Sequence, residues 1–400
     1  MRTYSRRTSR RARVTRFSPS PTGYLHIGGL FAAMTARLTA KATSGVFFLR
    51  IEDTDKKREV EGGVTAIVTG LAAFGITPDE GITGLGTESG VYGPYQQSKR
   101  REIYQCFAKE LVRQGLAYPC FCTEAELTAL REQQEAQAVN KGYYGEWAAC
   151  RNLAFCEQKQ AVEAGKPYTL RLRSPGDESR RILIDDLIKG KIEMPENAQD
   201  IVLLKTDGIP TYHFAHAVDD HLMRTTHVVR GDEWIASLPI HLQLFKCCGF
   251  KPPKYAHFAP IMKEENGGKR KLSKRKDPEA AVSYYIEQGY PKESVIEYLL
   301  TLANSNFEDW RRANKTAPQA DFPFNLKKMS ASGALFDLQK LNDVSKNVIS
   351  LMTADEVYDR AVNWAQQYDE ALYRLLMADE AFAKGIFCID RGVAKPRKDL

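Results

Sequence analysis

The chain lacks several features that would place it outside the ordinary globular proteins. No apolar run approaches the roughly 20 residues that a membrane-spanning helix needs, so we expect no membrane partner and a cytoplasmic protein. Eight cysteines among 400 residues are too sparse for a disulfide framework. No internal repeat is found, which excludes repeat architectures. The length instead suits two or three domains with a sizeable core of mixed helix and strand.

Acidic residues are absent from the first thirteen positions, and most of the net charge lies there. The formal net charge is +7, and six arginines of this leader supply six of these charges: Arg2, Arg6, Arg7, Arg10, Arg11 and Arg13. The remainder therefore carries about +1, so any RNA contact must use local patches rather than a generally basic surface. We expect the leader to be disordered, and an organelle-targeting segment is the alternative.

The first informative motif is Phe17–Gly29, which reads FSPSPTGYLHIGG. Two prolines stiffen the turn after a strand, and Gly23 permits a positive φ. Gly28 and Gly29 leave the start of the following helix without side chains, and a bare helix N-terminus binds anions. His26 beside it can donate a hydrogen bond to a phosphoryl oxygen. A purely structural histidine is the alternative.

The second motif lies some 240 residues later, at Lys269–Lys276, which reads KRKLSKRK. It suggests a mobile loop with six basic side chains in eight positions. Leu272 can anchor the loop while Lys271 and Lys274, on either side of Ser273, face phosphates as point charges. A solvated run of charges, such as a nuclear-localisation patch, is the alternative.

Together the two motifs resemble the HIGH and KMSKS motifs of class I aminoacyl-tRNA synthetases, and the Pro-Ser-Pro-Thr-Gly loop resembles that of bacterial-type glutamyl-tRNA synthetases. The resemblance extends from Val14 over nearly the whole chain. It implies ATP with Mg²⁺, glutamate and tRNA as partners, and His26, Lys271 and Lys274 as catalytic residues. The implied ATP-binding residues are Gly23, His26, Gly28, Gly29, Lys271, Ser273 and Lys274. The chain departs from the general pattern at Gly29, which stands where the motif has its second histidine.

Two arginines at strand ends suit the carboxylates of a glutamate substrate, because a guanidinium binds carboxylates with two parallel hydrogen bonds. They are Arg16 and Arg230, and the alternative is a pair of strand-end salt bridges. By resemblance, the glutamate-binding residues are Arg16, Ser18, Ser20, Glu52, Tyr212 and Arg230. Asp53 is expected to contact the acceptor end of tRNA. A helix cap or solvated acid is the alternative for Glu52 and Asp53.

The cysteines of the central region could bind zinc. Cys120, Cys122 and Cys150 supply three thiolates, with Tyr144, Cys156 or water as the fourth ligand. Free thiols packed in a small domain are the alternative.

Alternation of strand and helix predicts an α/β fold with a doubly wound parallel sheet. Strands are expected at 14–18 and 46–51, helices at 28–43 and 64–74, and a Gly-rich connection at 75–93. By resemblance the fold is the Rossmann-like one of class I synthetases with an inserted domain. The expected parts are a leader (1–13), the first catalytic half (14–117), an inserted acceptor-binding domain (118–200), the second catalytic half (201–262), the basic loop with a helical stem-contact region (263–350) and the start of a helical anticodon-binding region (351–400).

Three other functions remain open at this point. A glutaminyl-tRNA synthetase has the fold but usually a Pro-Glu-Pro-Ser-Gly loop. A glutamyl-queuosine tRNA synthetase lacks the stem-contact region and a good second motif. A non-catalytic tRNA-binding paralogue would not need both phosphate motifs. We also expect a monomer, and a chain truncated at its C-terminus, because the family's anticodon-binding part continues well beyond the segment matched by residues 351–400.

Overall fold

The computed structural model describes residues 9, 11–84, 86–265, 267–273, 275–389 and 391. The chain divides into two compact units. The first comprises residues 1–23, 32–68 and 78–258, and the second comprises residues 24–31, 69–77 and 259–400. Most of the basic leader lies outside the described residues. Within those residues, no helix combines the length and apolarity needed to cross a bilayer.

The first unit is built on a parallel sheet. Strands β1 (Val14–Phe17), β2 (Val46–Leu49) and β3 (Glu80–Gly84) run parallel, with β4 (Thr87–Ser89) antiparallel at the edge. Helices α1 (Ile27–Lys41) and α2 (Gly63–Ala73) connect the parallel strands. The predicted strand–helix order is confirmed. The stretch 75–93, predicted as a mere connection, instead contains β3 and β4.

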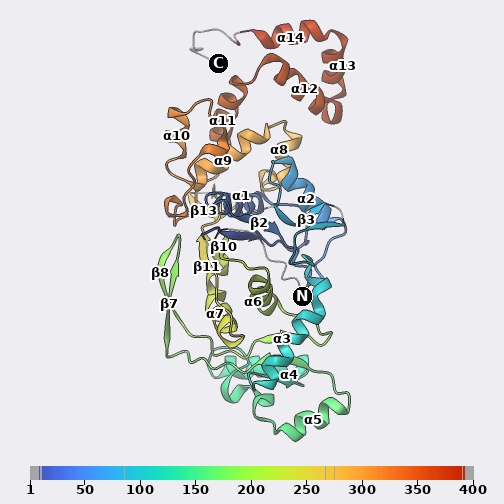
Figure 1. The fold of residues 1–400 in the computed structure, drawn as a ribbon, viewed down its shortest axis with the longest axis vertical. Helices are drawn as coiled ribbons and strands as arrows, with labels where there is room; N and C mark the ends of the chain where they lie inside the picture. The colour runs from blue at the N-terminus through green and yellow to red at the C-terminus, as the bar shows by residue number, and fades with distance from the viewer. Residues whose placement is uncertain are drawn as a thin grey trace. The chain divides into compact units, whose positions relative to one another are not determined.

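A second, two-stranded parallel sheet begins beside β1. Strands β10 (His227–Gly231) and β11 (Lys254–Phe258) are parallel partners. Thr226 N–H donates to the Val14 carbonyl at 2.9 Å, which places the start of β10 beside β1. The chain thus builds outward from β1 in both directions, and ligands of such sheets bind where the direction reverses, at the carboxyl ends of the strands. Helix α6 (Tyr212–Leu222) precedes β10 in the chain, and helix α7 (Leu238–Cys247) connects β10 to β11 (Figure 1).

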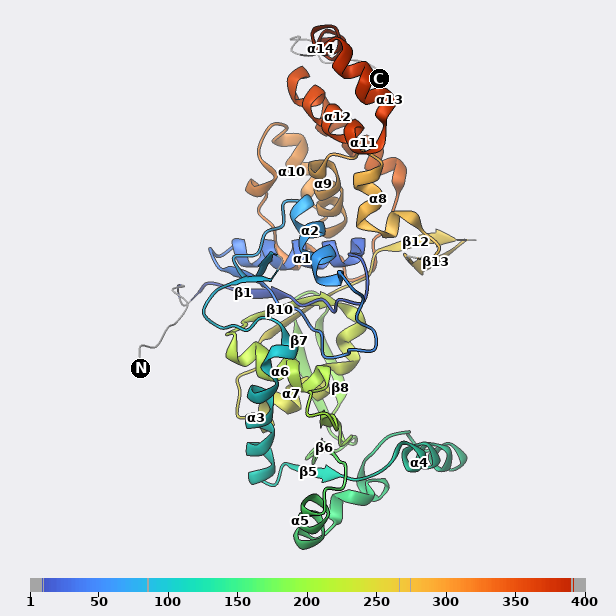
Figure 2. The ribbon, with the colours of Figure 1, turned by 90° about the vertical axis from the view of Figure 1, so that its right-hand side faces the viewer.

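A separate antiparallel sheet interrupts the parallel one, after helix α3 (Arg101–Arg113). It consists of β5 (Ala117–Cys120), β6 (Thr169–Leu172) and β9 (Val202–Leu204). Helices α4 (Glu124–Ala136) and α5 (Phe155–Glu163) lie near β5 (Figure 2). A hairpin of β7 (Arg181–Asp186) and β8 (Gly190–Pro195) follows. Residues 201–204, predicted to belong to the second catalytic half, are instead paired with β6 through β9.

The second unit joins the histidine motif to the region that follows the basic motif. His26 forms an antiparallel bridge with Ala281, and Val282 N–H donates to the Leu25 carbonyl. The hairpin of β12 (Met262–Glu265) and β13 (Gly268–Lys271) precedes this contact. The rest is helical, as predicted: α8 (Val282–Glu287), α9 (Lys292–Ala303), α10 (Phe307–Ala313), α11 (Leu338–Ser350), α12 (Ala354–Tyr368), α13 (Glu370–Ala378) and α14 (Glu380–Cys388).

Candidate active site

A network of buried charges lies where β1 and β2 end in the first unit. Arg16 of β1 donates from Nε to the Asp220 carboxylate at 3.2 Å. Arg50, fully buried after β2, donates to Asp220 at 2.7 Å and to Glu52 at 2.9 Å. Asp219 anchors the other side of the network by accepting from Arg100 at 2.7 Å. Such ions are stable inside a protein because each is both paired and hydrogen-bonded.

Two acids of this network have shifted acidities. Burial alone would raise the pKa of Asp220, but the positive charges of Arg16 and Arg50 outweigh it and hold that pKa below its ordinary value. For Glu52, burial raises the pKa although Arg50 and Arg16 act against it. The aspartate is therefore a permanent counter-ion, whereas the glutamate gains from a further positive group.

Arg230, at the end of β10, differs from Arg16 in its partners. Its Nε donates to His257 Nε2 at 3.0 Å, and its Nη atoms donate to the Tyr212 hydroxyl at 3.3 Å, to His241 Nδ1 at 3.2 Å and to the Trp234 carbonyl at 3.4 Å. Among the described residues, none of its partners is a carboxylate, although its side chain is only 6% exposed. A buried guanidinium with neutral neighbours is a ready receptor for an anion.

The histidines around the arginines are neutral. Burial lowers the pKa of His216 and of His241 well below the ordinary value, and nearby positive charges act in the same direction. Their rings lie 4.3 Å apart between centroids, and the His216 Nδ1 atom lies 3.3 Å from Arg16 Nη2. The histidines thus connect Arg16 to Arg230 without neutralising either guanidinium. Neither they nor Asp220 was singled out in the sequence, although five histidines from residue 213 to residue 241 were a visible signal.

The other predicted residues, Ser18, Ser20 and Asp53, differ in burial and in hydrogen bonding. The Ser18 Oγ atom is buried and has no hydrogen-bond partner among the described residues, so it is poised to contact a ligand. Ser20 is exposed on the loop after β1. Both carboxylate oxygens of Asp53 are engaged, because they accept from Gln96 Nε2 at 2.7 Å and from the Ser98 N–H at 2.8 Å. These contacts hold the Asp53 side chain in place, and its expected contact with the acceptor end of tRNA stays a prediction.

The histidine motif has a defined proton arrangement. Gly23 has a φ of +145°, as predicted for the turn. The Gly28 N–H donates to His26 Nδ1 at 2.9 Å, so a neutral ring carries its proton on Nε2, as a donor. The Gly28 N–H is therefore engaged by the ring of His26, and the assignment of Gly28 to the ATP site stays a prediction. A Cβ atom on Gly28 would lie 3.2 Å from Nδ1, so this glycine makes room for the ring.

The basic motif is more ordered than predicted. Its first part is strand β13 rather than a mobile loop. Leu272 is buried and anchors the segment, as predicted, while Lys271 is exposed. Ser273 N–H donates to Asp277 Oδ2 at 2.8 Å. Lys274 lies outside the described residues.

Asp277 holds this segment and was missed in the sequence. Its two oxygens accept a two-pronged pair of hydrogen bonds from Arg270, at 2.6 and 2.8 Å, and an ion pair with Lys263 at 3.1 Å. The hydrogen bonds from Arg270 are the main reason that the pKa of Asp277 is far below its ordinary value. An aspartate shortly after a basic run was the available signal.

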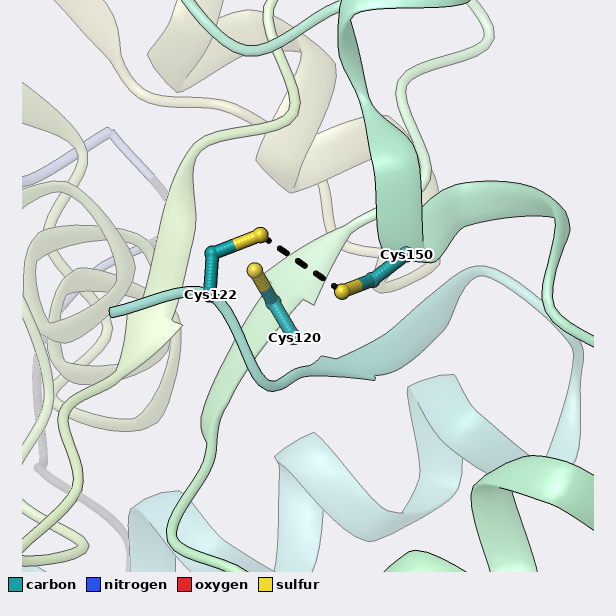
Figure 3. A group of neighbouring side chains, drawn as sticks. All are labelled: Cys120, Cys122 and Cys150. Atoms are coloured by element: carbon teal, nitrogen blue, oxygen red, sulfur yellow. Dashed lines mark hydrogen bonds between the residues drawn. The ribbon is translucent and has the colours of Figure 1, made fainter. Parts of the chain in front are cut away.

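The three predicted cysteines come together (Figure 3). The sulfur atoms of Cys120, Cys122 and Cys150 all lie within 4.8 Å of one another, with Cys122 and Cys150 at 3.6 Å. A tetrahedral zinc ion with Zn–S bonds of about 2.3 Å separates its sulfur ligands by about 3.8 Å, so the cluster fits zinc.

The Tyr143 side chain contacts the cluster, whereas the predicted Tyr144 and Cys156 do not, and the third predicted possibility, a water ligand, stays a prediction. The Tyr143 hydroxyl lies 3.4 Å from Cys120 Sγ and 3.3 Å from Cys122 Sγ. Tyr144 instead donates to the Asn140 carbonyl, and Cys156 is exposed on α5. Adjacent tyrosines point in different directions, and the sequence does not indicate which one turns inward.

Comparison with known proteins identifies relatives over most of the chain. The model described as tRNA synthetases class I (E and Q), catalytic domain, matches residues 13–343. A glutamate–tRNA ligase of Clostridium perfringens is 55% identical over 389 residues, covering 97% of this chain and 71% of the relative. One of Acetivibrio thermocellus is 52% identical over 396 residues, covering 99% and 72%. A crystal structure of a glutamate tRNA ligase from Elizabethkingia meningosepticum, in complex with its amino acid, has a TM-score of 0.79 at 33% identity and covers 94% of this chain and 79% of that one.

Proposed function

The chain belongs to the class I tRNA synthetases for glutamate and glutamine, and we propose on that basis that it is a glutamate–tRNA ligase. Such an enzyme uses ATP in two steps. The α-carboxylate of glutamate attacks the α-phosphorus of ATP, which forms glutamyl-adenylate and releases pyrophosphate. A hydroxyl of the 3′-terminal ribose of tRNA then attacks the carbonyl carbon of the adenylate and releases AMP. Positioning and charge stabilisation provide most of the rate enhancement.

Arg230 is the observation that carries the glutamate assignment. Among the described residues it has only neutral partners, so a substrate carboxylate supplies the charge that the buried guanidinium lacks. Glu52 receives the substrate ammonium group, which compensates the burial that raises its pKa. Ser18, Ser20 and Tyr212 orient the substrate, and Arg16 contributes positive potential although it already pairs with Asp220.

The phosphates of ATP are assigned to the histidine motif and the basic motif. His26 donates from Nε2 to a phosphoryl oxygen. Gly23 shapes the turn before it, and Gly28 and Gly29 keep the start of α1 without side chains. Lys271, Ser273 and Lys274 stabilise the departing pyrophosphate. Mg²⁺ accompanies ATP as its usual counter-ion. Residues 118–200 would hold the acceptor end of tRNA, and the helices after Pro278 would lie along its stem. A monomer in the cytoplasm remains a prediction.

The test is ATP–pyrophosphate exchange, measured with tRNA and with glutamate or glutamine as the amino acid. We expect exchange with glutamate and little with glutamine, because a guanidinium has only donors and the amide nitrogen of glutamine offers no acceptor. Equal exchange with glutamine would favour the glutaminyl alternative. No exchange with either would favour a non-catalytic paralogue.

Zinc is proposed for the cysteine cluster, with Cys120, Cys122, Cys150 and the Tyr143 hydroxyl as ligands. The ion would hold the segment after β5 against the turn that carries Cys150. Metal analysis of the purified protein should give one equivalent of zinc, lost in Cys120→Ser and kept in the control Cys106→Ser, whose thiol is exposed on α3. A metal-free protein whose stability is unchanged in Cys120→Ser would establish packed free thiols instead.

A further inference from the structure

Arg230 is the last of three buried side chains that are joined in a line by hydrogen bonds. Asp186 Oδ2 lies 2.7 Å from His257 Nδ1, and His257 Nε2 accepts from Arg230 Nε at 3.0 Å. All three residues are at most 6% exposed.

The protons of this line follow from the donors. Arginine has no acceptor atom, so His257 Nε2 must carry its lone pair toward Arg230. The proton of the neutral ring is therefore on Nδ1 and is donated to Asp186. Burial would raise the pKa of Asp186, but hydrogen bonds from His257 and from the backbone of Lys189 and Ile188 lower it overall. An ionised Asp186 thus fixes the tautomer of His257.

The two residues also determine how Arg230 is held. His257 accepts a hydrogen bond from Nε of the guanidinium, which leaves Nη1 to reach the Tyr212 hydroxyl and Nη2 to reach His241 and the Trp234 carbonyl. A neutral acceptor at Nε orients the fork without cancelling its charge, whereas a carboxylate in that place would compete with the substrate. The hydrogen bond to His257 therefore orients the guanidinium for a carboxylate and keeps the positive charge that attracts it.

We propose that Asp186 and His257 are positioning residues that orient Arg230 toward the carboxylate of the substrate. The inference rests on the proposed function, in which Arg230 binds glutamate. Asp186 ends β7, so the hairpin of β7 and β8, which lies along β11, takes part in substrate recognition (Figure 1). The turn between β7 and β8 also contacts the end of β10, because Lys189 of this turn pairs with Asp232, which follows β10, at 2.8 Å.

Two substitutions of His257 separate its two contacts. In His257→Gln the amide oxygen can replace Nε2 as the acceptor for Arg230, and in His257→Asn the amide nitrogen can replace Nδ1 as the donor to Asp186. His257→Asn should raise the KM for glutamate by about 10-fold to 100-fold, since it removes a hydrogen bond to a charged group. His257→Gln should raise it by less than about tenfold. The KM for ATP and the kcat at saturating glutamate should stay near wild type in both. His221→Asn, a half-buried histidine stacked on Phe250, is the matched control.

Three further results decide between the explanations. Asp186→Asn should raise the KM for glutamate, and the double variant with His257→Asn should be no worse than His257→Asn alone, because Asp186 acts only through the ring. Equal KM values for glutamate in His257→Gln and His257→Asn would overturn the positioning role. Additive effects of Asp186→Asn and His257→Asn in the double variant would overturn it as well, so one test remains if a single variant folds poorly. An Arg230→Lys variant with wild-type KM would instead remove the glutamate assignment of Arg230 itself, which separates failure of the proposed function from failure of the inference.

Discussion

The sequence predicted the same role, binding of a glutamate carboxylate, for Arg16 and Arg230. In the structure the two guanidinium groups differ in the charge of their partners. Arg16 is already neutralised by Asp220, while the described neighbours of Arg230 are imidazoles, a phenol and a carbonyl. Removing one partner of a buried ion pair costs about 3–5 kcal/mol, because the remaining charge stays buried. Arg16→Ala should therefore destabilise the protein, whereas Arg230→Ala should mainly weaken glutamate binding. Urea unfolding and the KM for glutamate of the two variants check this contrast, and equal unfolding free energies would contradict it.

A second prediction at the residue scale concerns His26. His26→Ala should lower the rate of adenylate formation on the order of 10²-fold, which is typical of removing one donor to a transition state. Gly28→Ala should also lower it, because its Cβ would lie 3.2 Å from His26 Nδ1 and displace the ring. ATP–pyrophosphate exchange at saturating glutamate measures both. A normal rate in His26→Ala would show that the ring is structural.

At the scale of elements, Asp277 connects the β12–β13 hairpin to the part of the basic motif that follows it. The carboxylate receives Arg270 of β13, Lys263 of β12 and the Ser273 N–H. These contacts join the strand to the segment that follows it. The positions of Lys271 and Ser273 thus depend on an acid that contributes no contact to phosphate in the proposed function.

Asp277→Ala should free this segment. We expect faster trypsin cleavage within residues 269–276 and a higher KM for ATP, because the hydrogen bonds of Arg270 and Ser273 are lost together. The KM for glutamate should change little, since its proposed site lies in the first unit. Asp343→Ala, which removes an exposed aspartate of α11, is the control. Unchanged cleavage in Asp277→Ala would mean that the hairpin alone orders the segment.

At the scale of the whole molecule, the buried histidines make stability depend on pH. His213, His216, His241 and His257 all have a pKa lowered by burial. The unfolded chain, with a histidine pKa of about 6.5, therefore binds more protons than the folded chain below that pH. The contribution is fully present above about pH 6.5 and is lost as the pH falls toward the folded-state value.

Each such histidine adds a slope of at most about 1.4 kcal/mol per pH unit to the unfolding free energy below that pH. Urea unfolding between about pH 7 and pH 5 should show stability falling with pH, a window above the ordinary pKa of carboxylates. His216→Asn should reduce the slope by about one histidine's share. A stability that stays constant over this range would contradict the buried neutral state.

The sequence by itself determined the features that depend on local backbone and burial. Gly23 indicated its positive φ, Leu272 its anchoring role, and the strand–helix alternation the parallel sheet. These predictions succeeded because a turn, a buried side chain and the period of a strand are each written in neighbouring residues. The two phosphate motifs indicated a family on the same local basis.

Only the tertiary structure decided which polar groups pair. The acid that neutralises Arg16 stands 204 residues away in the chain, and the ring that grips Arg230 comes from another strand. For the same reason, Asp53 accepts from the Ser98 N–H, and Tyr143 rather than Tyr144 lies against the cysteines. A sequence shows which groups carry donors, acceptors and charge. Whether a partner already occupies them depends on contacts between distant segments. At this site that occupancy distinguishes Arg16, which pairs with Asp220, from Arg230, whose described partners are neutral.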